Sequence, residues 1–105
     1  MDKYILITST CPDIATAKAI AKLLVESRFA ACVQMLPIES VYSWRTEIHC
    51  ENEILLLIKT TINIFDKITT VIKANHPYKV PEIIQIPIND GLPEYLRWID
   101  DCVGE

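Results

Sequence analysis

The sequence is poor in glycine and in basic residues. Only two of its 105 residues are glycines, Gly91 and Gly104, and neither belongs to a glycine-rich loop of the kind that cradles phosphate groups. Lysine and arginine number 10 against 14 aspartates and glutamates, which gives a formal net charge of -4. A phosphate backbone requires a clustered excess of basic side chains, and no segment shows one. These shortages predict that nucleic acid is not a partner.

Long uncharged stretches are also missing. The longest covers residues 29 to 38, whereas a membrane-spanning helix needs roughly 20 consecutive apolar residues. The first residues, Met1 to Tyr4, lack a basic segment followed by an apolar run and a small-residue cleavage site. We therefore expect no membrane partner and a cytoplasmic location.

The cysteines have no metal-finger spacing. Cys11, Cys32, Cys50 and Cys102 include no C-x-x-C pair, which argues against a structural zinc site. Cys11 differs from the others because it lies between a predicted strand and a predicted helix. Amide groups of a first helical turn lower the pKa of a nearby thiol, so Cys11 is a candidate metal ligand.

Apolar residues, in contrast, are abundant. They make up 50% of the chain, and the mean hydropathy is +0.23. A chain of this length forms one domain, residues 1–105, and exposes much of its surface. Part of the apolar surface is therefore expected to be covered by another subunit.

Hydrophobic periodicity predicts strands and helices in the order βαββαβ, followed by a terminal helix. Apolar residues at helical spacing run from Ile14 to Val25 and from Ile64 to Ile72, and a short helix follows Pro93. The extended segments are 4–8, 31–36 with a continuation at 41–44, 47–59, and 83–87.

Several residues predict where these elements begin and end. Thr10, followed by Asp13 and with Pro12 between them, resembles a capping box at the start of the first helix. Thr61 or Asn63 is expected to cap the second helix. Pro37 is expected to interrupt the second strand at a sheet edge or a bulge, because proline cannot donate to a ladder.

This order predicts a ferredoxin-like α+β fold, in which two helices cover one face of an antiparallel sheet. The strands are apolar on both sides, so the opposite face also needs a cover. Self-association is the simplest way to supply it.

Several segments together resemble the CutA family of divalent-cation tolerance proteins. The most specific is H-P-Y-K-V-P-E-I-I, from His76 to Ile84, together with Y-S-W at 42–44. The resemblance also rests on Ala30-Ala31-Cys32-Val33, Pro37, Ser40, Glu53, Leu57-Ile58-Lys59-Thr60 and Tyr95-Leu96-Arg97-Trp98-Ile99.

The resemblance implies a homotrimer similar in architecture to the PII signalling proteins. It implies a non-catalytic role in the response to metal ions, with Cu(II) or another divalent metal ion bound and no organic cofactor. Two other functions stay open. One is a PII-like signalling module that binds a small anionic ligand, and the other is a structural trimeric scaffold.

The candidate metal ligands are His76, Cys11 and Glu82. His76 precedes Pro77, which favours an extended backbone and projects the imidazole from a loop, where it either ligates a metal ion or makes one hydrogen bond. Imidazole and thiolate both suit copper and zinc, and Glu82 or a neighbouring subunit would supply a third ligand. In the bacterial family pattern, a cysteine stands where this chain has Ser9 and a histidine where it has Asn75. A weaker candidate pair is His49 with Glu51, which share one face of a strand.

A second candidate site is an inter-subunit cleft lined by Trp44, Lys59, Tyr78 and Glu82. These residues supply an acid, a base and two aromatic rings, a set suited to a small anionic or aromatic ligand.

The tip of the predicted hairpin departs from the family pattern, because Arg45-Thr46 stands where relatives often carry a glycine. Either the turn tolerates Thr46, or the tip is restructured by about one residue.

Overall fold

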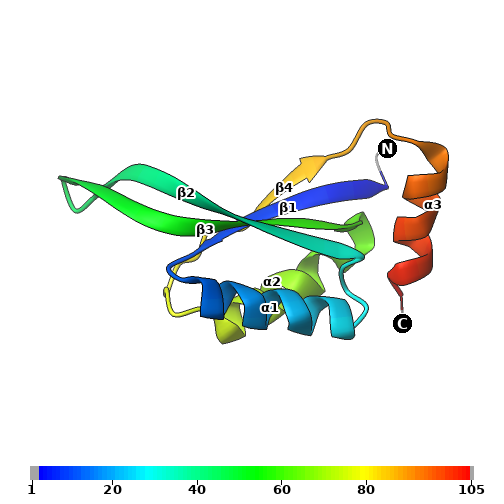
Figure 1. The fold of residues 1–105 in the computed structure, drawn as a ribbon, viewed down its shortest axis with the longest axis horizontal. Helices are drawn as coiled ribbons and strands as arrows, with labels where there is room; N and C mark the ends of the chain where they lie inside the picture. Colours follow the sequence, from blue (N-terminus) through cyan, green and yellow to red (C-terminus); the bar gives the residue numbers. More distant parts are fainter. Residues whose placement is uncertain (1–2, 105) are drawn as a thin grey trace.

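The computed structural model describes residues 3–104 and places four strands and three α-helices among them (Figure 1). Among these residues, no helix combines the length and the apolar character needed to cross a bilayer. The elements are β1 (Tyr4–Cys11), α1 (Ile14–Glu26), β2 (Cys32–Trp44), β3 (Glu47–Thr61), a 3-10 turn (Ile62–Ile64), α2 (Phe65–Asn75), β4 (Ile84–Pro87) and α3 (Pro93–Cys102).

The strands form one antiparallel sheet in the order β2-β3-β1-β4. Figure 1 shows α1 and α2 together on one side of this sheet, with α3 standing beside the end at which β1 begins. The predicted ferredoxin-like arrangement with an added C-terminal helix is therefore confirmed.

The core lies between the sheet and the helices α1 and α2. Alternate residues of β1 and β3 point into it, and the register places Ile7 opposite Ile58. The apolar stripes of the two helices pack against them. The largest apolar side chains buried there are Ile5, Ile7, Leu56 and Ile58 from the sheet, Ile20 and Leu24 from α1, and Ile68 and Ile72 from α2.

The hairpin of β2 and β3 extends well beyond the rest of the sheet (Figure 1). β1 ends at Cys11, opposite Ile54 of β3, so the hairpin beyond Ile54 has no strand beside it on that edge. β2 runs without interruption through Pro37. The expected break there is wrong, but β2 is an edge strand, and an edge strand tolerates proline because its outer backbone groups have no ladder partner.

The start of α1 differs from the expectation. Asp13 is the N-cap, and its side chain accepts a hydrogen bond of 2.8 Å from the backbone N–H of Thr16. Thr10 does not cap the helix because β1 continues through Cys11 and keeps Thr10 in the strand. The predicted cap of α2 is wrong, because Ile64 is its N-cap residue and no side chain caps the helix. Thr61 and Asn63 belong to the 3-10 turn before α2 and its start, where the Thr61 hydroxyl donates to Asn63 Oδ1 at 2.6 Å.

Polar contacts hold α3 against the end of the sheet. Asp100 accepts a hydrogen bond from the Tyr4 hydroxyl and forms an ion pair of 2.8 Å with the Lys3 ammonium group. The Arg28 guanidinium group donates to the carbonyl of Cys102, at 3.2 Å. The C-terminal helix is therefore tied both to β1 and to the loop after α1.

The hairpin tip is a two-residue turn. Arg45 and Thr46 have φ values of 51° and 66°, the left-handed conformations of a type I′ turn. This confirms that the turn tolerates Thr46 rather than being restructured. A β-branched residue is strained in this conformation, which glycine adopts freely.

We expect Thr46→Gly to raise the free energy of unfolding by about 1 kcal/mol, because it removes this strain at a moderate entropic cost. Thermal unfolding followed by circular dichroism measures the change. Thr46→Ala is the matched control, since alanine keeps a Cβ and should bring little gain. A lower melting temperature for Thr46→Gly would show that the turn is not strained.

Candidate functional site

The sheet face opposite α1 and α2 is apolar and uncovered over much of its area in the single chain. The register places Thr8 of β1 between Leu57 of β3 and Ile84 of β4 on this face. Ile84 is 50% exposed and Ile86 is 43% exposed, both unusually high for isoleucine in a sheet. The prediction that the strands are apolar on both sides is therefore confirmed. We call this surface the open face.

His76 lies at the end of β1 with both ring nitrogens engaged. The backbone N–H of Tyr78 donates to Nδ1 at 3.0 Å, so the neutral ring carries its hydrogen on Nε2. Nε2 then donates to the carbonyl oxygen of Thr10 at 2.7 Å. The side chain is only 9% exposed. No lone pair remains for a metal ion in this arrangement, and His76 instead fastens the loop after α2 to β1.

Cys11 is fully buried at the end of β1. Burial, with smaller contributions from the Asp13 and Glu53 carboxylates, raises the pKa of its thiol to about 11. The expected lowering of this pKa is wrong, because Cys11 is a strand residue and the amides of α1 begin only at Ile14. Cys11 is therefore a protonated core thiol at neutral pH rather than a ready ligand.

Glu82 is the one predicted metal ligand that lies exposed. Its Oε2 accepts a hydrogen bond of 3.0 Å from the Thr8 hydroxyl, which places the carboxylate beside the open face. Within residues 3–104, the one ion pair joins Lys3 and Asp100, so Glu82 has no cationic partner there. The same residues contain no group of three His, Cys, Asp or Glu side chains able to hold a metal ion. The predicted ligands thus do not form a metal centre within one chain.

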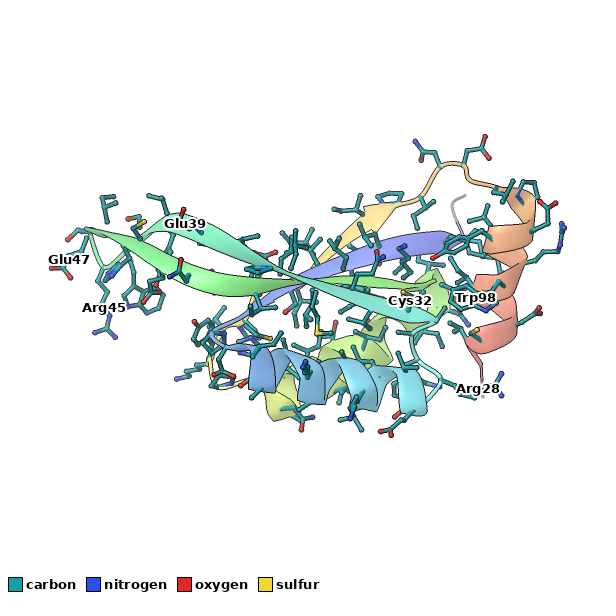
Figure 2. The ribbon with its side chains drawn as sticks, in the orientation of Figure 1. Arg28, Cys32, Glu39, Arg45, Glu47 and Trp98 are labelled. Carbon is teal, nitrogen blue, oxygen red and sulfur yellow. The ribbon has the colours of Figure 1, made fainter. Side chains whose placement is uncertain are left out.

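The residues of the predicted cleft are also separated within the chain. Trp44 pairs with Glu47 and Lys59 pairs with Cys32. Figure 2 shows Glu47 and Cys32 at opposite ends of the hairpin. Trp44 and Lys59, their strand partners, therefore also lie at opposite ends of the hairpin. One chain does not bring them together, and the cleft stays a prediction for an assembly of chains.

The structure reveals one cluster that we had not predicted. It consists of Tyr42, Glu51, Glu53 and Tyr78, and we call it the tyrosine-glutamate cluster. The Tyr42 hydroxyl donates to Glu51 Oε1, and this bond raises the pKa of Tyr42 to about 12. Burial, followed by the charges of Glu53 and Glu51, raises the pKa of Tyr78.

The sequence carried only part of the signal for this cluster. Alternation along residues 47–53 predicts a polar face, which contains Glu51 and Glu53. Tyr78, however, reaches the cluster because His76 fixes the loop against Thr10, and no local pattern encodes that contact. The anionic ligand of the inter-subunit cleft, which Tyr78 was predicted to line, stays a prediction.

Comparison with known proteins gives consistent matches. Residues 5–102 match the family model described as CutA1 divalent ion tolerance protein. The divalent-cation tolerance protein CutA of Thermus thermophilus is 46% identical over 105 residues, which cover 99% of this chain and 100% of the relative.

Solved structures match over nearly the whole chain. A structure of the divalent cation tolerance protein from Thermus thermophilus has a TM-score of 0.94 and 44% identity, and the match covers 96% of this chain and 99% of that one. The periplasmic divalent cation tolerance protein CutA of Archaeoglobus fulgidus gives a TM-score of 0.94 at 39% identity, with the same coverage.

The environment of Cys11 predicts low reactivity. In the folded protein, iodoacetamide at about pH 8 should modify the exposed Cys50 and leave Cys11 unmodified, because its thiol is buried and protonated. Peptide mass spectrometry before and after unfolding in guanidinium chloride measures both sites. Equal labelling rates for Cys11 and Cys50 in the folded protein would contradict the assignment of Cys11 to the core.

Proposed function

The chain belongs to the CutA1 divalent ion tolerance protein family. From this membership we propose that it acts as a homotrimer and binds Cu(II) or another divalent metal ion between its subunits. The observation that carries the proposal is the open face, with Glu82 at its side. A cytoplasmic location and the absence of catalysis stay predictions from the sequence.

Self-association explains why the open face is apolar. A β-sheet is stable in water when its apolar faces are covered, and α1 and α2 cover one face only. Ile84 and Ile86 are already about half buried, so covering the rest of each side chain would add roughly 0.7–1.5 kcal/mol, about half the value for a fully exposed one. A trimer is the assembly that the family resemblance implies, and it covers this face without a second protein.

Glu82 is the residue best placed to bind a metal ion at such an interface. Of the three predicted ligands, His76 uses both ring nitrogens within the chain and Cys11 is buried. Glu82 offers carboxylate oxygens with no described cationic partner. One carboxylate is too few for a stable metal site, so the remaining ligands would come from a second chain.

Calorimetric titration of the EDTA-dialysed protein with Cu(II) and Zn(II) tests this assignment. Glu82→Gln should weaken binding by about tenfold or more, since it replaces a charged ligand with a neutral amide. Glu26→Gln, which alters an exposed carboxylate at the end of α1, is the matched control and should bind like the wild type. A wild-type protein with no saturable heat below about 1 mM metal would rule out the proposal.

A His76→Ala variant separates the two candidate ligands. We expect it to lower the free energy of unfolding by roughly 1–3 kcal/mol, because the Thr10 carbonyl and the Tyr78 amide lose their partner. Metal affinity should be unchanged. If the folded variant loses metal binding while Glu82→Gln retains it, the imidazole is the ligand and Glu82 is not.

A further inference from the structure

The tyrosine-glutamate cluster contains two carboxylates that form no ion pair with a described residue. Glu53 is only 8% exposed, and glutamate is seldom buried to this extent without a partner group. Within residues 3–104, however, the one ion pair is that of Lys3 with Asp100. The Tyr78 hydroxyl, whose pKa the Glu53 charge raises, is neutral and supplies no cation.

Aromatic rings stand beside the two carboxylates. Tyr42 pairs across the strands with His49, and their rings stack with centroids 5.3 Å apart. The Tyr42 hydroxyl holds Glu51 by a hydrogen bond. Tyr78 lies near the end of β1, because its ring is 4.8 Å from that of His76, which is hydrogen-bonded to Thr10. The charges of Glu53 and Glu51 contribute to the raised pKa of its hydroxyl.

A second observation at the same place indicates a missing partner. The Nε2 atom of His49 is buried and has no hydrogen-bond partner among the described residues. His49 and Glu51 are alternate residues of β3 and therefore share one face of the strand. A buried polar atom without a partner is unusual in a folded protein.

The composition of the cluster suits an organic cation better than a bare metal ion. A metal ion needs three or more ligands at short distance, and no such group of His, Cys, Asp or Glu is present in residues 3–104. Carboxylates beside aromatic rings instead match an ammonium or guanidinium group, which forms ion pairs with the former and cation–π contacts with the latter. We propose that Tyr42, Glu51, Glu53 and Tyr78 form a binding site for a primary ammonium or guanidinium group.

This site is distinct from the metal site assigned to Glu82. It lies where the hairpin leaves the body of the molecule, beyond the end of β1 (Figure 1). The cation could belong to a free amine or to a lysine or arginine side chain of another polypeptide. The chemistry of recognition is the same for both sources, so the probes must separate them.

Titration of the ¹⁵N-labelled, EDTA-dialysed protein, followed by two-dimensional NMR, tests the proposal. The probes are n-butylammonium chloride for a free amine, and N-acetyl-lysine amide and N-acetyl-arginine amide for a protein side chain. We expect saturable shifts at the amides of residues 49–53 and Tyr78. Binding of butylammonium alone assigns the site to free amines, and binding of the capped amino acids assigns it to protein side chains. Either outcome supports the proposal.

Variants test which residues bind the cation. Glu53→Gln should weaken binding by about tenfold or more, because it replaces a carboxylate that would pair with the cation by a neutral amide. Tyr78→Leu, which removes one ring, should weaken it several-fold and serves if Glu53→Gln does not fold. Glu47→Gln, an exposed carboxylate on the same strand, is the matched control and should bind like the wild type. Glu82→Gln should also leave amine binding unchanged, so failure of the metal proposal and failure of this one are distinguishable.

Three results would overturn the proposal. The first is a set of shifts that sodium chloride at the same ionic strength reproduces. The second is a folded Glu53→Gln variant that binds the probes as the wild type does. The third is saturation of the same amides by magnesium chloride at lower concentration than by any of the organic cations.

Discussion

The burial of apolar side chains on both faces of a single four-stranded sheet is the constraint on which the rest of the structure depends. One face is covered by α1 and α2, and its side chains form the core around Ile7 and Ile58. The other face carries equally apolar residues, such as Ile84 and Ile86, and they remain exposed in the single chain. The single chain therefore folds with one apolar face of its sheet exposed, and such a face is typical of an interaction site.

The polar groups that matter lie at the edges of this apolar face. Glu82 stands beside Thr8, and the tyrosine-glutamate cluster lies where β1 ends and the hairpin continues alone. His76 connects these regions, because its hydrogen bonds to Thr10 and Tyr78 fix the loop that leads to Glu82. Packing of a second chain against the open face would therefore bring its side chains close to the carboxylates at the edge. In such an assembly, the apolar surface and the candidate cation sites would be parts of one interface.

The fold could be predicted from the sequence because periodicity records which side of each element is buried. The apolar stripe of α1 and the two-sided apolar character of β3 and β4 gave the element order and the need for a cover. Local motifs were less reliable. Thr10 lost its capping role because the strand pairing of β1 extends through Cys11, and Pro37 did not break β2 because an edge strand tolerates proline. A local sequence pattern predicts neither how far a strand stays paired nor whether it lies at the edge of the sheet.

The candidate site was harder to predict for the same reason. His76 and Cys11 have the chemistry of metal ligands, but tertiary contacts give His76 two internal hydrogen bonds and bury the Cys11 thiol. Tyr78 joins Glu51 and Glu53 only through the folded loop.

Light scattering coupled to size-exclusion chromatography tests the central claim, that the open face is covered by self-association, most directly. If two further copies of the chain help to cover the open face, the particle at micromolar concentration has three times the 12.0 kDa chain mass. A particle of 12.0 kDa would contradict the claim.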